Sequence, residues 1–210
     1  MTITRDAVID WLKAFADTIA QQKDYLTQLD SDIGDGDHGT NMNRGMQSVL
    51  TVLPGVADKD IGSIFKTVGM KLVSTVGGAS GPLYGTMFMQ MGSATNGKME
   101  LTLDDWVAAV QAGTDGVVMR GKAQLGDKTM VDALTPALNS LKESAAHNVP
   151  LPDALNAAAE ATKGGMEATI PIVARKGRAS YLGERSAGHQ DPGSTSSYYL
   201  MKTAADTWNK

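Results

Sequence analysis

Apolar residues recur at steps of three and four along most of this chain, which is the spacing of amphipathic helices. The first such stretch runs from Arg5 to Leu29, and seven more follow it. They cover residues 42–53, 61–72, 82–91, 103–117, 131–141, 153–169 and 191–208. No segment carries a convincing strand pattern. We therefore predict an all-α protein with eight helices.

Residues that favour helix starts stand just before most of these stretches. A side chain at such a position accepts a hydrogen bond from a backbone N–H group that has no partner within the helix. The candidates are Asp58 or Asp60, Thr102 with Asp105, Thr129 with Asp132, and Asp191 followed by Pro192. These signals support the helix boundaries that the apolar pattern predicts.

Short connections between the helices predict an antiparallel bundle or barrel that forms a single domain over residues 1–210. In an up-and-down bundle, alternate loops lie at the same end. The loops after the first, third, fifth and seventh helices are also the unusual ones in composition. They cover residues 30–39, 77–81, 121–128 and 175–191. We therefore expect one rim of the bundle to hold the functional site.

The loop from Asp30 to Gly39 contains four aspartates and three glycines in ten residues. Like charges about 4 Å apart repel by on the order of 4 kcal/mol at an effective dielectric constant of about 20, so this cluster favours a bound cation. Oxygen ligands without cysteine favour Mg²⁺, Mn²⁺ or Ca²⁺ over zinc. The spacing excludes an EF-hand, since Gly34 and Asn41 stand where that loop needs acidic or amide ligands and a glutamate. An exposed turn without metal is the alternative interpretation.

The loops at 77–81 and 175–191 add possible anion contacts. Glycine-rich backbone that leads into a helix start suits a bound anion, because free N–H groups and the helix dipole face it. Small residues that allow close helix packing are the alternative explanation for the glycines at 77–85. The later loop is polar and basic and contains Arg178, so it is typical of a surface loop or lid.

Composition limits the possible partners. The 210 residues carry a formal net charge of -4, which argues against nucleic acid or an anionic membrane surface as a ligand. The first residues are polar, no apolar run has the length of a membrane span, and cysteine is absent. We therefore expect a cytoplasmic protein that binds small molecules or other proteins.

Carboxylates for a hard cation, glycine-rich helix starts and a basic loop together suit a bound polyphosphate. Metal ions and an arginine supply most of what phosphoryl transfer requires of a protein. The sequence therefore favours a phosphotransferase. It shows no recognisable acceptor site, because His147 and His189 are isolated. The acceptor is expected on another chain.

Four long motifs resemble the nucleotide-binding L subunits (DhaL) of bacterial dihydroxyacetone kinases, and the resemblance extends over nearly the whole chain. The motifs are Ile33–Gly39 with Asn41–Gly45, Gly77–Pro82, Arg120–Lys122 with Gly126–Met130, and Ala174–Ser186 with Gly188–Gly193. The resemblance implies an eight-helix barrel whose rim binds ADP through two Mg²⁺ ions.

The resemblance also implies roles for individual residues. Three aspartates would hold the Mg²⁺ ions, namely Asp30, Asp35 and Asp37, whereas Asp32 would not. Contacts to the phosphates or ribose would come from His38, Gly39, Thr40, Asn41, Ala79 and Ser80. Residues that close over the nucleotide would be Gly121, Met130, Arg178, Asp191, Pro192 and Gly193. Met130 would pack on the adenine, with core filling as its alternative role. Arg178 would be catalytic and would stabilise the transferring phosphoryl group.

The resemblance further implies partners. In the family, a K subunit holds dihydroxyacetone, and in one branch an M subunit of the phosphotransferase system rephosphorylates tightly bound ADP. A separate chain of this length resembles that branch. Two alternatives stay open: a nucleotide-state sensor that binds a transcription regulator, and an ATP-dependent kinase subunit for another acceptor.

Overall fold

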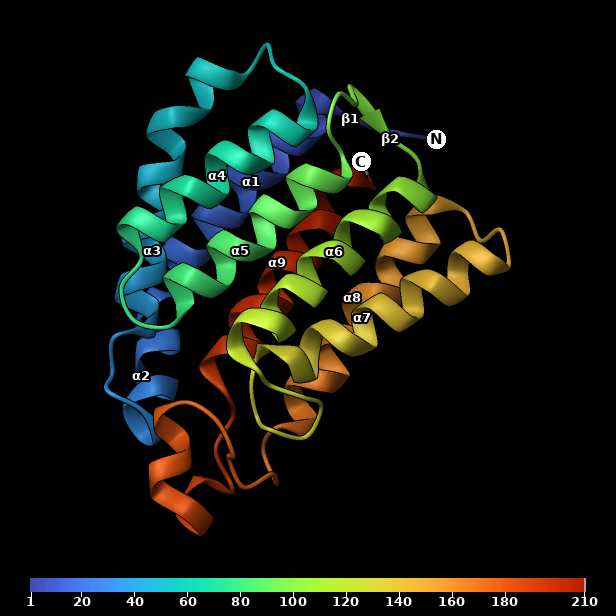
Figure 1. Cartoon of the computed structure of the whole chain (residues 1–210). Helices are drawn as coiled ribbons and strands as arrows, with labels where there is room; N and C mark the ends of the chain where they lie inside the picture. The colour runs from blue at the N-terminus through green and yellow to red at the C-terminus, as the bar shows by residue number, and fades with distance from the viewer. Residues whose placement is uncertain (210) are drawn as a thin grey trace.

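The computed structural model describes residues 1–209 and is almost entirely helical (Figure 1). Within these residues there are nine α-helices, two 3-10 helices and two strands of two residues each. The α-helices are α1 (Arg5–Gln21), α2 (Lys23–Ile33), α3 (His38–Val52), α4 (Ile61–Thr75), α5 (Ser80–Ala94), α6 (Leu103–Gly121), α7 (Met130–Ala146), α8 (Leu151–Ala168) and α9 (Pro192–Trp208). The 3-10 helices are η1 (Leu53–Val56) and η2 (Arg178–Ser186), and the strands are β1 (Ile3–Thr4) and β2 (Glu100–Leu101). The predicted all-α class is confirmed.

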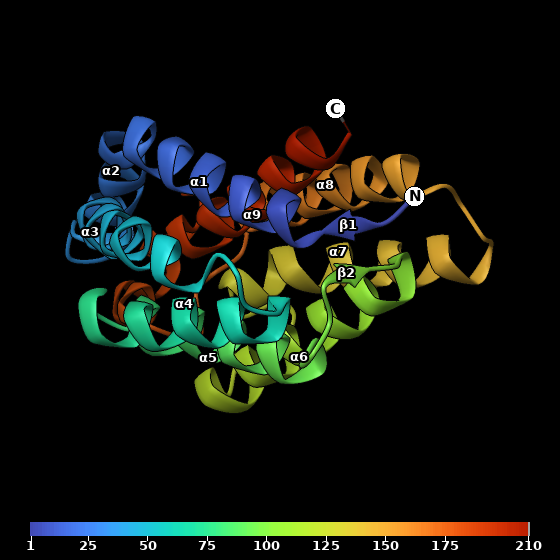
Figure 2. The same cartoon turned by 90° about the horizontal axis from the view of Figure 1, so that it is seen from above.

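The helices form a closed ring in which neighbours along the chain pack side by side. From α3 to α9 each α-helix contacts the next one, and α1 closes the ring by contacting both α9 and α3. Figure 2 shows this ring from above, and α2 lies beside α3 at its edge. Of the two predicted arrangements, a bundle or a barrel, the closed ring corresponds to the barrel. None of the helices in the described part of the chain combines the length and the apolarity needed to cross a membrane.

The first predicted helix is wrong in two respects. Residues 5–29 do not form one helix, and the helical backbone continues to Ile33, so residues 30–33 of the predicted loop form the end of α2 and residues 38–39 form the start of α3. The chain breaks at Gln22, whose backbone lies at φ -95° and ψ 6°, and α2 begins at the next residue. The four polar residues from Gln21 to Asp24 interrupt the apolar stripe at this point. This break accounts for the difference between the eight predicted helices and the nine observed.

The predicted helix starts are observed. Thr102 with Asp105 and Thr129 with Asp132 form reciprocal capping boxes at α6 and α7. Asp60 rather than Asp58 caps α4, and its carboxylate accepts the Ser63 N–H at 3.1 Å. Asp191 caps α9, with Pro192 as the first helical residue. The short-range sequence signals therefore set the starts of these four helices.

Trp11 lies at the centre of the core. Its ring centroid is 5.1 to 6.1 Å from those of four aromatic residues on other helices, namely Phe65 on α4, Phe88 on α5, Trp106 on α6 and Trp208 on α9. Its indole N–H also donates to the Leu200 carbonyl oxygen at 3.1 Å. One side chain on α1 thus ties together four other helices of the ring.

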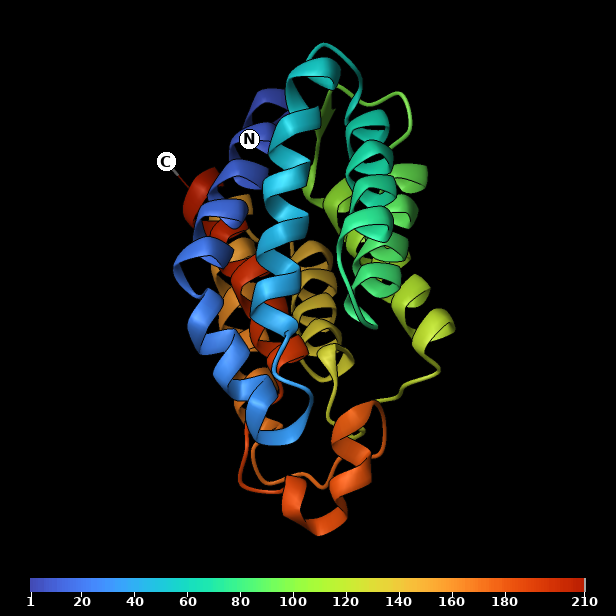
Figure 3. The ribbon, with the colours of Figure 1, turned by 90° about the vertical axis from the view of Figure 1, so that its left-hand side faces the viewer.

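The glycines of the 77–85 region serve helix packing in part. A Cβ atom on Gly85 would come within 2.9 Å of the Gly69 carbonyl oxygen, so the backbones of α4 and α5 approach each other too closely for a side chain here. The first residues of this region form the α4–α5 connection. Figure 3 shows that this connection (green) lies at the same rim as the α2–α3 connection (blue) and η2 (orange). The packing explanation and a rim site are therefore compatible.

Candidate functional site

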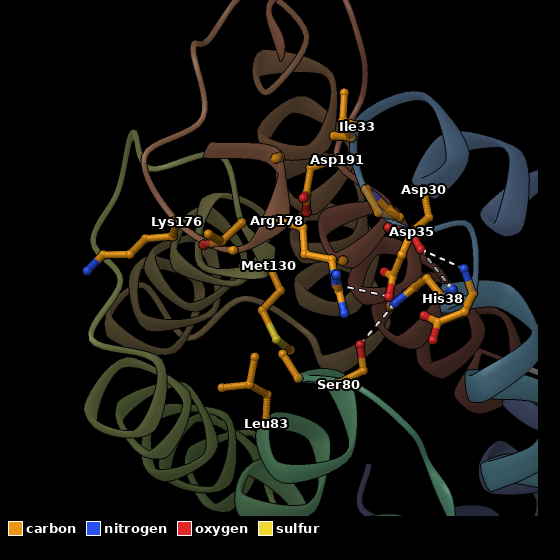
Figure 4. A pocket seen from close by; sticks show the side chains of 18 of the residues that line it. Asp30, Ile33, Asp35, His38, Ser80, Leu83, Met130, Lys176, Arg178 and Asp191 are labelled. Atoms are coloured by element: carbon orange, nitrogen blue, oxygen red, sulfur yellow. Dashed lines mark hydrogen bonds and ion pairs between the residues drawn. The ribbon is translucent and has the colours of Figure 1, made fainter. Parts of the chain in front are cut away.

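The four unusual loops meet at a single pocket at one rim of the ring, as the alternation of helices predicts (Figure 4). The lining includes eleven of the residues that the sequence singled out. These are Asp30, Asp35, Asp37, His38, Ala79, Ser80, Met130, Arg178, Asp191, Pro192 and Gly193. Segments separated by up to about 160 positions along the chain thus contribute to one site.

Three carboxylates form the acidic side of the pocket. Asp30, Asp35 and Asp37 each offer an oxygen atom, and these three atoms all lie within 4.8 Å of one another. One oxygen of Asp30 accepts the N–H groups of Asp37 at 2.8 Å and His38 at 3.1 Å, which holds the loop in a tight turn. Asp32 instead accepts a hydrogen bond from Gln28. Three hard oxygen ligands at this spacing fit Mg²⁺.

Arg178 reaches this acidic cluster from the basic segment. Its Nε atom lies 2.9 Å from Oδ2 of Asp35, although two thirds of the arginine side chain is exposed. Gly177 precedes it with φ +65° and ψ -167°, a conformation that other residues rarely adopt. This turn directs the guanidinium group toward the carboxylates. The arginine can therefore contact a ligand held between them.

His38 is buried at the first position of α3 and joins three helices. Its two ring nitrogens lie 3.0 Å from the Ser80 hydroxyl and 2.9 Å from the Ser196 hydroxyl. Ser196 in turn lies 2.8 Å from the Tyr84 hydroxyl. Burial lowers the pKa of His38 to about 4, against the opposing effect of Asp30 and Asp37. The imidazole is therefore neutral at physiological pH and positions Ser80 at the pocket.

Two buried titratable groups, Asp191 and Lys128, also line the pocket. Burial raises the pKa of Asp191 to about 7, although its carboxylate accepts the Ser194 N–H at 2.5 Å. Burial also lowers the pKa of Lys128, and the charge of Asp191 opposes that shift. Charged groups of this kind are costly to bury in a protein without a functional or structural reason.

Four α-helices begin at this pocket. Their first residues, His38 of α3, Ser80 of α5, Met130 of α7 and Pro192 of α9, all belong to the lining. Each helix start carries a partial positive charge of roughly half a unit and free backbone N–H groups. The pocket therefore combines an acidic side suited to cations with four helix starts suited to an anion, which is the pattern a metal-bound polyphosphate requires.

Four of the predicted site residues lie outside the lining. Gly39 is buried against α2, where a Cβ atom would approach the Lys23 carbonyl oxygen within 1.9 Å. Thr40 is exposed, and Asn41 is buried and accepts a hydrogen bond from Arg44 at 2.7 Å. Gly121 ends α6 beside Leu83, which does line the pocket. Their predicted contacts with a ligand stay predictions.

Several residues that line the pocket were assigned no role at the site from the sequence. They are Ile33, Leu83, Tyr84, Lys128, Thr129 and Lys176. Tyr84 and Leu83 directly follow the glycine cluster, so their position was a usable signal. Lys128 lies in a loop that was predicted to reach the rim, but its burial was not indicated, because a lysine in a polar loop is normally exposed. Met130 lines the pocket and also belongs to the hydrophobic core, so its position is compatible with packing on an adenine ring and with core filling.

The ring of helices and this pocket define a class of protein, namely an all-α domain with a candidate cation and polyphosphate site at one rim. A family model described as the DAK2 domain matches residues 32–206, and the chain belongs to this family.

Some curated relatives have nearly the same length as this chain, and others are longer proteins of which it matches only a part. The ADP-binding subunit DhaL of PEP-dependent dihydroxyacetone kinase from Escherichia coli (strain K12) is 49% identical, over 98% of each chain. The corresponding subunit of the PTS-dependent kinase from Lactococcus lactis is 44% identical, over 96% of each. The L-erythrulose 1-kinase of Mycolicibacterium smegmatis is 34% identical over 95% of this chain, which matches only 35% of that longer protein.

Solved structures agree with the fold. The dihydroxyacetone kinase of C. freundii in its native form aligns with a TM-score of 0.73 and 25% identity. The same kinase in complex with AMP-PNP and Mg²⁺ aligns with a TM-score of 0.71 and 26% identity. Both alignments cover 94% of this chain and 33% of the kinase. The fold found here therefore occurs as one part of a larger kinase chain.

Proposed function

We propose that this chain is the ADP-binding subunit of a phosphoenolpyruvate-dependent dihydroxyacetone kinase. Bound ADP receives a phosphoryl group from an M subunit and becomes ATP. The terminal phosphoryl group would then leave the β-phosphate oxygen of ATP and form a P–O bond to a hydroxyl oxygen of dihydroxyacetone on a K subunit, the hydroxyl proton would pass to a base or to solvent, and ADP would be regenerated. The nucleotide acts as a cofactor that remains in its site.

One observation carries this proposal. Three carboxylate oxygens within 4.8 Å of one another face a pocket at which four α-helices begin. The acidic cluster alone would repel a phosphate, and the helix starts alone would not hold a metal ion. A magnesium complex of a nucleotide satisfies both sets of groups at once. The names of the close relatives support the same class of ligand.

Within this proposal, Asp30, Asp35 and Asp37 hold two Mg²⁺ ions, which neutralise the charge of the phosphate groups. Residues that contact the phosphates or ribose are His38, Gly39, Thr40, Asn41, Ala79 and Ser80. Residues that enclose the nucleotide are Gly121, Met130, Arg178, Asp191, Pro192 and Gly193. The neutral imidazole of His38 keeps the Ser80 hydroxyl oriented, and the position of Met130 in the pocket lining supports an adenine contact.

Arg178 is the proposed catalytic residue. Its Nε atom lies 2.9 Å from Asp35, so its charge is already next to the group that would hold a metal ion. An arginine at this point stabilises the negative charge of the transferring phosphoryl group, and such an arginine contributes about 10³-fold or more to the rate. Arg178→Met is expected to lower turnover of the reconstituted kinase by at least about that factor while the thermal stability of the chain changes little.

The partners remain part of the proposal. No acceptor group stands out near the pocket in the described residues, which supports a K subunit that supplies the acceptor and an M subunit that supplies the phosphoryl group. Tyr181 is 87% exposed on η2, a helix that also carries Arg178 and Arg185, and an exposed aromatic side chain at this rim favours contact with another protein. A transcription regulator that reads the nucleotide state is the second candidate for this surface.

Native mass spectrometry of the purified chain tests the cofactor proposal. We expect a retained mass of one ADP with two Mg²⁺ ions. Asp35→Asn should lose this mass, whereas Asp32→Asn, which lies three positions earlier in the last turn of α2 and outside the cluster, should keep it. An empty wild-type site that fills only with added ATP would point to an ordinary exchangeable substrate.

An activity measurement tests the need for partners. The chain alone, supplied with ATP and dihydroxyacetone, should form no product, and turnover should appear only when the K subunit and a phosphorylated M subunit are both added. Turnover by the isolated chain would contradict the proposal.

A pull-down experiment with a transcription regulator, in the ADP and ATP states of the chain, tests the sensor alternative. Absence of binding in both states would exclude that alternative. Replacement of dihydroxyacetone by erythrulose tests whether another acceptor is preferred.

A further inference from the structure

The Lys128 ammonium group lies inside a cage of backbone carbonyl oxygens. The residue is only 1% exposed. Its Nζ atom lies 2.9 Å from the oxygen of Thr169, 3.4 Å from Ile170, 3.1 Å from Ile172 and 2.7 Å from Ser186, and it also contacts the oxygen of His189. An ammonium group has three N–H bonds, so five surrounding oxygens exceed what directed hydrogen bonds alone would use. The arrangement resembles the carbonyl shell of a bound cation.

The backbone of Lys128 indicates that this side chain has a specific role. Its φ angle is +63°, in the left-handed region that favours glycine, asparagine or aspartate. The sequence nonetheless has lysine here, which loses side-chain freedom and hydration on burial as well. The carbonyl cage, together with the negative charge of Asp191, offsets these costs.

The cage joins the two ends of one long segment, residues 169–191, which connects α8 to α9 and contains η2 (Figure 1). Three of the carbonyl groups directly follow α8, and the other two come shortly before α9. Further contacts support this closure: the Gly188 N–H donates to the Ile170 oxygen at 2.8 Å, and the Arg175 N–H donates to the Asp127 oxygen at 3.1 Å. Arg178 lies in the middle of the segment so closed.

We propose that Lys128 is a positioning residue, whose ammonium group serves as a permanent internal cation around which residues 169–191 fold. By fixing both ends of this segment, it sets the position from which Arg178 reaches Asp35. The lysine acts through the segment and through Arg178, without a contact to the transferred group. The link to phosphoryl transfer rests on the proposed function, whereas the folding of the segment does not.

Trypsin provides a local test, because the segment contains four cleavage sites after Arg175, Lys176, Arg178 and Arg185. Cleavage at these sites is followed by mass spectrometry in the nucleotide-free chain. Lys128→Gly removes the ammonium group and suits the left-handed backbone. Since hydrogen bonds to a charged group are among the stronger ones, cleavage within the segment should accelerate by on the order of tenfold or more.

The matched control is Lys122→Gly. Lys122 lies in the same loop, also has a left-handed backbone at φ +49°, and is exposed. This variant should show the cleavage rate of the wild type. Equal rates in the two variants, or accelerated cleavage spread evenly along the Lys128→Gly chain, would overturn the proposal.

Chemical rescue tests the cation itself. Ammonium chloride should restore slow cleavage to Lys128→Gly, because an ammonium ion can occupy the carbonyl cage, whereas the same concentration of tetramethylammonium chloride should not. If Lys128→Gly does not fold, Lys128→Met provides the test. It should show the faster cleavage without rescue, since its side chain fills the space that the ion needs. Rescue of Lys128→Gly by both salts alike would contradict the proposal.

Kinetics of the reconstituted kinase separate positioning from general stability. Lys128→Met should lower the turnover number with little change in the retention of ADP, and its effect should nearly disappear in an Arg178→Met background. Full additivity of the two substitutions would contradict action through Arg178. Loss of ADP binding in the wild type would instead contradict the proposed function, and the trypsin comparison in the nucleotide-free chain would stand independently of it.

Discussion

Replacement of Asp191 by asparagine is expected to stabilise the nucleotide-free chain at pH 8. Burial raises the pKa of this carboxyl group from 3.8 to about 7. The folded chain therefore binds a proton that the unfolded chain releases between these two pH values, and the free energy of unfolding falls as the pH rises through that window. Above pH 7 the folded chain holds a buried, negatively charged carboxylate at its full cost.

The size of this cost follows from the shift. A difference of about 3 pH units at about 1.4 kcal/mol per unit amounts to roughly 4 kcal/mol at pH 8. Asparagine has no charge, and its side-chain oxygen can still accept the N–H group that the Asp191 carboxylate accepts at the start of α9. Asp191→Asn should therefore raise the free energy of unfolding at pH 8 by on the order of 2 to 4 kcal/mol, with a smaller gain at pH 5.

Urea unfolding followed by tryptophan fluorescence, with EDTA and without nucleotide, measures this difference. Asp60→Asn is the matched control, because Asp60 caps α4 with the same kind of hydrogen bond. The hydrogen bond from the Ser63 hydroxyl lowers the pKa of Asp60 in the folded chain, so the charged carboxylate stabilises the fold at pH values above the pKa of the unfolded chain. Asp60→Asn should therefore destabilise the chain at pH 8. If both substitutions destabilised the chain equally, the argument from the burial of Asp191 would be refuted. A rise in the free energy of unfolding of Asp191→Asn would also show that the chain keeps the Asp191 charge at the expense of stability, as is common in binding sites.

Two other substitutions test the geometry of the site. His38 has its pKa lowered to about 4, so the unfolded chain takes up a proton near pH 6.5 that the folded chain takes up only near pH 4. The free energy of unfolding should therefore fall by roughly 3 kcal/mol as the pH drops through this range. His38→Gln should flatten the curve of unfolding free energy against pH. An unchanged slope would contradict the burial of a neutral imidazole. Gly177→Ala should lower kinase turnover by about tenfold or more, because alanine at φ +65° would shift Arg178. Gly97→Ala, with φ +76° and equally open surroundings, should reduce only thermal stability, and equal turnover in the two variants would refute this role of Gly177.

The helices could be predicted from the sequence because their signals are local. Apolar spacing and capping residues act within a few positions, and Thr102, Thr129 and Asp191 cap helices as their neighbours in the sequence indicate. The break at Gln22 was missed, since apolar residues continue on both sides of a short polar run. The strands β1 and β2 were missed because two residues are too few to show an alternating pattern.

The site was predictable only in part. The alternation of loops correctly brought the acidic, glycine-rich and basic segments to one rim, since that inference depends on chain topology alone. The burial of Lys128 and Asp191 depends on how residues 169–191 fold back over the ring, and a local pattern carries no information on such a contact. The hydrogen bond that joins His38 to Ser196 on α9 spans 158 positions along the chain and could not be predicted for the same reason.

Calorimetry of Mg²⁺ binding tests the central claim most directly, because the claim is that Asp30, Asp35 and Asp37 form a metal site that the phosphates of a nucleotide complete. The titration is made on the nucleotide-free chain and again in the presence of ADP, with Asp32→Asn as the control that should match the wild type. We predict weak Mg²⁺ binding without ADP and a marked gain in affinity with it. Tight binding to the nucleotide-free chain, with no gain on addition of ADP, would contradict the account.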